Sequence, residues 1–111
     1  MHVTTYGVTI EMIFEWDEAK NKQNIKKHCF DLADAQGLFT GNDPLFVTLD
    51  SHEDYGEKRW KGIGVLEGIL VVVVIFTERG DDTIRIISLR KANSRERRAY
   101  EEEIKNRLDA R

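Results

Sequence analysis

The residues with the most evident chemistry lie between Arg85 and Arg98, where charge of one sign is concentrated. Six basic side chains stand there against one acid, Glu96, although the whole chain has a formal net charge of -3. A guanidinium is a planar fork that can meet a phosphate with two hydrogen bonds. This basic segment therefore indicates a phosphate-bearing ligand. Its basic residues are Arg85, Arg90, Lys91, Arg95, Arg97 and Arg98.

Arg85 and Arg90 differ from the other arginines in their expected surroundings. Arg85 lies inside a strand predicted over residues 83–89, and Arg90 lies just where that strand ends. Each position fits either phosphate binding or a buried ion pair with one of the acids, and the sequence leaves both open. The three remaining arginines fit the solvated face of a helix, paired in part with acids at i+4 spacing.

Arg59 and Arg79 are further candidates outside the basic segment. Arg59 and Trp60 are neighbours on a predicted strand, so their side chains point to opposite faces. The tryptophan is expected in the core, which leaves Arg59 on a face that it can share with Arg85. Arg79 is expected to be exposed in a hairpin turn.

His28 is adjacent to Cys29, but neither residue has the partner spacing of a metal site or a catalytic nucleophile. A helix-end histidine beside a buried thiol is the more ordinary interpretation. The chain has no Walker loop, dinucleotide-binding glycine fingerprint or GxSxG elbow, so nucleotide-dependent and α/β-hydrolase chemistry have no support. No metal and no cofactor is expected.

Hydrophobic periodicity predicts the elements that position these residues. The apolar run over residues 69–76 must lie at the centre of a sheet, because an edge strand of that kind would aggregate. Two helices therefore precede an antiparallel meander of four strands, and a basic helix follows it. This is an α+β fold with segregated helices. The predicted strands cover residues 13–16, 45–49, 58–65, 69–77 and 83–89, and the first two helices begin at Asp17 and Asp31.

The two ends of the basic segment have their own patterns. In the strand, Ile84 and Ile86 are expected on one face, with Arg85, Ile87 and Leu89 on the other. The helix that follows begins at Asn93 or Ser94, with Glu96 at capping-box spacing. Its one apolar stripe predicts docking along its length, with the arginines left free. The stripe consists of Tyr100, Ile104 and Leu108.

Length and composition bound the class of protein. A chain of 111 residues with one proline is expected to form a single domain. One cysteine cannot form an internal disulfide, so a reducing cytoplasm is the expected compartment. The apolar run over residues 69–76 is much shorter than the roughly 20 residues of a membrane-spanning helix, so no membrane is expected.

Several segments together resemble the BrnT toxin family: FEWDEAKNKQNIKKH, DLADAQGLF, YGEKRWKGIG, VIFTERGDD and IRIISLRKANSRERRAYEE. The similarity extends from Phe14 to about Glu102, and ISLRKANSRERRAY is its most specific part. The resemblance implies one BrnT-like domain over residues 1–111, with residues 1–11 as a possible extension, and a RelE/ParE-like fold. Cys29 departs from the family, where a glycine commonly follows the KH pair; glycine adopts the left-handed helix end more easily.

The resemblance also implies a metal-independent ribonuclease that stops translation. Such cleavage needs a base for the 2'-hydroxyl, cations for the phosphate and an acid for the 5'-oxygen. We expect Arg85, Arg90 and Arg59 to bind the scissile phosphate and Arg79, Lys91 and Lys27 to contact RNA. His28 is the first candidate for the base because of its pKa range. Lys27 as base and Tyr100 as acid remain open.

The expected partners also follow from the resemblance. They are a BrnA-type antitoxin in a complex of two toxins and two antitoxins, RNA as substrate, and operator DNA reached only through that complex. A second hypothesis is a catalytically silent module whose basic face holds an acidic antitoxin helix and whose complex represses its own operon. Nothing in the sequence favours the third possibility, poisoning of DNA gyrase.

Overall fold

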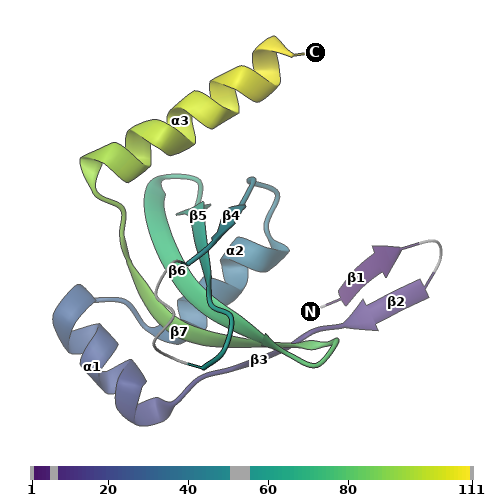
Figure 1. Ribbon diagram of the computed structural model, residues 1–111, viewed down its shortest axis with the longest axis vertical. Coiled ribbons are helices and arrows are strands. Elements are labelled where there is room, and N and C mark those ends of the chain that lie inside the picture. The colour runs from purple at the N-terminus through teal and green to yellow at the C-terminus, as the bar shows by residue number, and fades with distance from the viewer. Residues whose placement is uncertain (1, 6–7, 51–55, 111) are drawn as a thin grey trace.

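The computed structural model describes residues 2–5, 8–50 and 56–110, and for residues 2–11 it describes the backbone alone. The centre of the protein is a five-stranded sheet in the order β3-β7-β6-β5-β4 (Figure 1). β6 lies between two antiparallel neighbours, which confirms its predicted central place, and β3 runs parallel to β7. The strands are β3 (Ile13–Glu15), β4 (Phe46–Leu49), β5 (Trp60–Leu66), β6 (Leu70–Arg79) and β7 (Thr83–Lys91).

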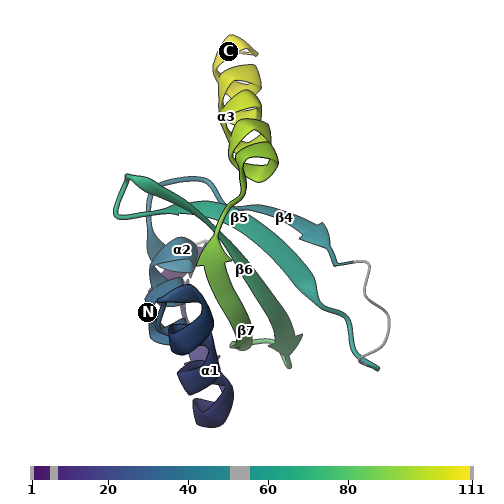
Figure 2. The same cartoon turned by 90° about the vertical axis from the view of Figure 1, so that its left-hand side faces the viewer.

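The helices are unevenly distributed around this sheet. Figure 2 shows α1 and α2 on one side of the sheet, whereas α3 stands away from it at the end of β7. Two short strands before β3 form a separate antiparallel hairpin. The sequence also predicts a solvated acidic loop over residues 50–57, which lies largely outside the described residues. No helix within the described ranges is long and apolar enough to cross a membrane. The helices are α1 (Glu18–His28), the 3₁₀ turn η1 (Leu32–Ala35), α2 (Gln36–Thr40) and α3 (Ser94–Asp109), and the hairpin strands are β1 (His2–Thr5) and β2 (Val8–Glu11).

The core lies between the sheet and the segment formed by η1 and α2. Leu32 and Leu38 from that segment are buried against Val74 of β6 and its neighbours. Asp31 caps this segment as predicted, although the first turn is 3₁₀ and not α-helical. Gly64 of β5 allows this close packing, because a Cβ there would lie 3.0 Å from the Leu38 and Leu45 side chains. We call this side of the sheet the helix-covered face.

A β-bulge in β7 corrects the predicted faces of that strand. Ile86 pairs with Phe76 and Ser88 pairs with Ile75, so Ile87 has no partner opposite it on β6. The extra residue shifts the alternation by one. Leu89 is consequently buried on the helix-covered face with Ile84 and Ile86, and Arg85 and Arg90 share the opposite face.

α3 contacts the sheet through Tyr100 and through Arg107, whose guanidinium carbon lies 4.6 Å from the centre of the Phe46 ring, which corrects the predicted docking along the whole stripe. Its start is as predicted, since Asn93 caps the helix and forms a capping box with Glu96. Tyr100 is buried, and its ring lies 5.1 Å from that of Phe46. Leu108, at the far end of the stripe, is 57% exposed. The backbone of the second half of α3 stands away from the sheet (Figure 1).

Cys29 ends α1 in the left-handed conformation, with φ 64° and ψ 24°. The thiol is exposed, so the predicted buried thiol is wrong. The turn expected of glycine is nevertheless kept, because the Cys29 amide donates to the Ile25 carbonyl at 2.8 Å. A side chain with a Cβ costs about 1 kcal/mol in this region of backbone space.

Cys29→Gly is expected to stabilise the protein by roughly 1 kcal/mol, because the conformational cost disappears and no buried contact is lost. For a domain of this size that corresponds to a rise in Tm of about 4 °C. Thermal unfolding followed by circular dichroism measures it. Cys29→Ala is the matched control: it removes the thiol but keeps the Cβ, and its Tm should stay at the wild-type value. An equal rise in Tm in both variants would mean that removal of the thiol, and not relief of the backbone conformation, stabilises the protein.

Candidate functional site

The face of the sheet opposite α1 and α2 carries a series of basic side chains. Arg85 and Arg90 point to this face because of the bulge, and Lys61 of β5 belongs to it because it pairs with Ile75 rather than with the core residues. Trp60 packs against the core, which leaves Arg59 on the basic face as predicted. We call this side of the sheet the basic face.

Arg85, Arg79 and Arg59 form one ion-paired group with two acids. Glu15 of β3 lies beside Arg85 in the sheet register, with Oε1 3.4 Å from Arg85 Nη1 and 3.5 Å from Arg79 Nε. Glu57 contacts the other side of Arg79 at 3.7 Å and Arg59 at 3.9 Å. These five residues are the arginine cluster. Three guanidiniums and two carboxylates leave it one net positive charge.

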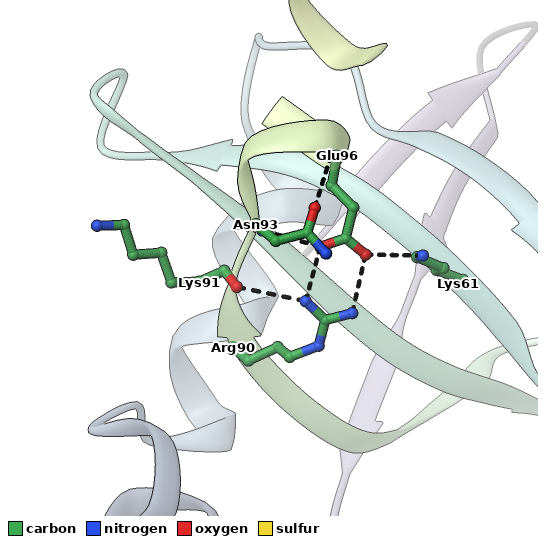
Figure 3. A network of polar contacts seen from close by, with 5 residues as sticks. All are labelled: Lys61, Arg90, Lys91, Asn93 and Glu96. Atoms are coloured by element: carbon green, nitrogen blue, oxygen red, sulfur yellow. Dashed lines mark hydrogen bonds and ion pairs between the residues drawn. The ribbon is translucent and has the colours of Figure 1, made fainter. Parts of the chain in front are cut away.

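Arg90 belongs to a different group, which is centred on Glu96 (Figure 3). Arg90 donates from Nη1 and Nη2 to the two carboxylate oxygens of Glu96, at 2.8 and 2.9 Å. Lys61 reaches the same carboxylate at 2.8 Å, and the Asn93 amide donates to it at 2.9 Å. We call these four residues the Glu96 cluster. Arg90 therefore has an ion pair with an acid of the same chain, the alternative to phosphate binding that the sequence left open, and this pair is partly buried.

The electrostatics of the Glu96 cluster indicate that its role is structural. Hydrogen bonds from Arg90, Lys61 and the Asn93 amide hold the pKa of Glu96 far below its ordinary value, against the opposing effect of burial. The same carboxylate raises the pKa of Arg90. An acid that is this difficult to protonate is a poor proton acceptor. Its effect is to fix the first turn of α3 to the end of β7.

His28 lies at the C-terminal end of α1, in the electrostatic field of Arg90 and not of Arg85. Burial is the largest cause of its lowered pKa, and the charges of Lys27 and Arg90 add to it. These effects favour the neutral imidazole, which is the form that a general base needs. Lys27 and Lys91 are both exposed at this end of the sheet.

The seven residues predicted to form one site are thus divided between two places. Arg85 pairs across the sheet with Thr77, and Arg90 pairs with Val73, four residues further along β6. At about 3.3 Å per residue the two positions are roughly 13 Å apart. Arg59, Arg79 and Arg85 lie at one place; Arg90, Lys91, Lys27 and His28 lie at the other. Tyr100 is in neither group, because its hydroxyl donates to the Pro44 carbonyl at 2.9 Å.

Sequence reasoning missed three charged residues on the basic face. Glu15 and Glu57 hold the arginine cluster, and Lys61 shares Glu96 with Arg90. Lys61 and Arg59 stand two apart on the strand, a spacing that places both on one face and could have identified the lysine. Glu15 lies 70 positions before Arg85 in the chain, so nothing local pairs them. In the described part of the chain, no group of three or more His, Cys, Asp or Glu could hold a metal ion.

The fold and the basic face agree with one class of protein, the toxins of type II toxin-antitoxin systems. The chain belongs to the family described as ribonuclease toxin, BrnT, of type II toxin-antitoxin systems, whose model matches residues 16–96. Its structure is similar to the crystal structure of the Brucella abortus ribonuclease toxin BrnT, with a TM-score of 0.58 and 32% sequence identity over 75% of this chain and 99% of that one. A comparison with curated proteins gave no match. The predicted family and α+β class are confirmed.

Proposed function

We propose that this chain is an active, metal-independent endoribonuclease whose RNA strand lies across the basic face. The arginine cluster carries the proposal, because Arg79 and Arg85 come from neighbouring strands and point out of a face that α1 and α2 leave uncovered (Figure 2). Guanidiniums fixed in this way stabilise negative charge that develops on a phosphate. Their side chains are 50% and 28% exposed, so a phosphate can reach both.

The second group of predicted residues fits a role further along the same strand of RNA. Arg90 is locked to Glu96, and the roughly 13 Å between Arg85 and Arg90 is more than one phosphate can bridge. Exposed Lys91 follows Arg90 on β7, and the last turn of α1, near Arg90, carries exposed Lys27 and half-exposed His28. In this arrangement Arg85, Arg79 and Arg59 act at the scissile phosphate, while Arg90 and its neighbours position the backbone.

The toxin class implies an antitoxin, and we propose that it is of the BrnA type, in a complex of two copies of each protein. Free toxin in the cytoplasm then inhibits translation by cleaving RNA, and operator DNA is bound only through the complex. We also infer that the sheet and its helices are a RelE/ParE-like variant. Antitoxin binding is expected to cover the basic face, because the same charges that hold RNA attract an acidic helix.

One observation favours the second hypothesis, a catalytically silent module. Arg85 and Arg90 are both ion-paired with acids of the same chain, the arrangement that the sequence left open as the alternative to phosphate binding. The two pairs differ in strength, however. The shortest contact between Arg85 and Glu15 is 3.4 Å, whereas charge-assisted hydrogen bonds are typically about 2.7–2.9 Å. A phosphate can therefore displace the pair at Arg85 more easily than the pair at Arg90.

Purified, antitoxin-free protein is expected to cleave a labelled single-stranded RNA at the same rate with and without EDTA. The cleaved ends should be a 2',3'-cyclic phosphate and a 5'-hydroxyl, because the attacking oxygen comes from the RNA itself. Gel electrophoresis with end-group analysis measures both. Addition of a BrnA-type antitoxin should stop the reaction. A protein that binds the antitoxin and cleaves neither free RNA nor RNA on ribosomes would be the silent module.

A further inference from the structure

We infer that Glu15 is the general base of the proposed ribonuclease, a role that rests on the proposed function. The base must stand next to the cations that hold the scissile phosphate, because the 2'-oxygen and the phosphorus become bonded. Glu15 is the carboxylate between Arg79 and Arg85, with its Oε1 3.5 and 3.4 Å from their guanidiniums. The three side chains come from β3, β6 and β7, so the sheet itself sets their spacing.

The other candidate general bases either have structural hydrogen bonds or lie far from these arginines. Asp17 accepts hydrogen bonds from the Ala19 and Lys20 amides as the cap of α1, and the first of its causes of a lowered pKa is the Lys20 amide. Glu96 is locked in its own cluster, about 13 Å along the sheet. His28 lies at the other end of α1, and 10 residues of helix between Glu18 and His28 span roughly 15 Å.

The basic face has two acids that pair with arginines, Glu96 and Glu15. Their contacts and exposure show which of the two can take part in proton transfer. Glu96 receives two short bonds from Arg90 and one from Lys61, and its side chain is 9% exposed. Glu15 makes two longer contacts, both through Oε1, and its side chain is 39% exposed. The hydrogen bond that Arg85 donates to Glu15 is long, 3.4 Å, and goes to Oε1. The first pair is structural, and the second is open to substrate.

Glu57 is the nearest rival, and its position is less suited to the role. Its contacts to Arg79 and Arg59 are 3.7 and 3.9 Å, and the Arg59 side chain is only 13% exposed. Glu57 also precedes β5 in irregular backbone, whereas Glu15 lies on a strand that is hydrogen-bonded to β7. A reacting group is held most precisely on a regular element of the scaffold.

The step balances without any other reactant than water. The 2'-oxygen attacks the phosphorus while its proton moves to the Glu15 carboxylate. The O2'–P bond forms and the P–O5' bond breaks, and the 5'-oxygen leaves with a proton from water. Arg79 and Arg85 stabilise the charge on the non-bridging phosphate oxygens. The protonated Glu15 then returns its proton to solvent.

Glu15→Gln tests the role, because glutamine keeps the size and an accepting oxygen for Arg85 but cannot take a proton. We expect kcat to fall by at least about 100-fold, the usual range for a general base, with KM and RNA binding changed less than about threefold. The acidic limb of the kcat–pH profile should disappear. The charged groups that contact this carboxylate are Arg85 of β7 and Arg79 of β6.

Glu57→Gln makes the same chemical change at the other acid of the arginine cluster and weakens ion pairs only. It should lower kcat by less than about fivefold, because general-base catalysis is retained. Equal losses in the two variants, or a Glu15→Gln enzyme within about threefold of wild type, would overturn the role of Glu15 while wild-type cleavage still supports the proposed function. A wild-type protein that cleaves no RNA would overturn both.

Discussion

Replacing Arg85 with alanine is expected to slow RNA cleavage by about 100-fold or more, the loss that follows removal of one preorganised transition-state cation. Arg85 is the member of the arginine cluster held by the most regular surroundings, since it pairs with Thr77 on one side and with Glu15 on the other. The loss should appear mainly in kcat, because charge on the phosphate oxygens grows toward the transition state. Single-turnover cleavage of a labelled RNA measures it.

Two further variants separate the role of Arg85 from charge in general. Arg85→Lys keeps the positive charge but loses the planar fork, so its rate is expected to lie between those of wild type and Arg85→Ala. Arg95→Ala removes an exposed arginine of α3, outside the arginine cluster, and should cleave at the wild-type rate. If Arg85→Ala keeps its Tm and cleaves within about threefold of wild type, Arg85 does not act at the scissile phosphate.

The features that were predictable from the sequence are those encoded within a few neighbouring residues. The Asp31 cap and the capping box of Asn93 with Glu96 depend on side chains that reach amides two or three positions away. The central place of β6 follows from its unbroken apolar run. The resemblance of ISLRKANSRERRAY to one family was equally local, and the match over residues 16–96 confirms it.

The candidate site was less predictable because its pairs join distant parts of the chain. Glu15 reaches Arg85 only because β3 pairs in parallel with β7. The hydrophobic periodicity of the sequence does not predict which strand β3 pairs with. The bulge at Ile87 moved Leu89 into the core, although strict alternation placed it on the other face. The sequence identified the individual arginines as candidates. It could not show that Arg85 pairs with Glu15 and Arg90 with Glu96, because these pairs depend on where β3 and α3 dock.

Asn24→Ala is expected to destabilise the protein by about 3 kcal/mol, the largest single effect on folding that the structure indicates. β3 pairs with β7 only as far as Arg85, so the edge of β7 beyond it needs another partner. Asn24 of α1 supplies it: its Oδ1 accepts from the Leu89 amide at 3.2 Å, and its Nδ2 donates to the Leu89 carbonyl at 2.9 Å. Nδ2 also donates to the Phe30 carbonyl at 2.9 Å.

Alanine removes all three hydrogen bonds at a side chain that is only 7% exposed. Each buried group left unsatisfied costs about 1–3 kcal/mol, and the better helix propensity of alanine returns at most about 0.7 kcal/mol. Urea unfolding measures the difference, with an expected fall in Tm of more than about 10 °C in parallel. Gln23→Ala, at the neighbouring exposed position of α1, should leave the stability within about 0.5 kcal/mol of wild type.

The Asn24 variant also tests how the basic face is assembled. Asn24 ties α1 to β7 one residue before Arg90, and His28 follows one turn later on the same helix. Loss of that tie should weaken RNA binding at the Arg90 end of the face while single-turnover cleavage at saturating RNA stays within a few-fold of wild type. The reason is that Glu15 and Arg85 belong to strands that pair without α1. A parallel collapse of the cleavage rate in a folded Asn24→Ala protein would instead join the two groups of residues into one catalytic site and return His28 to it as the base.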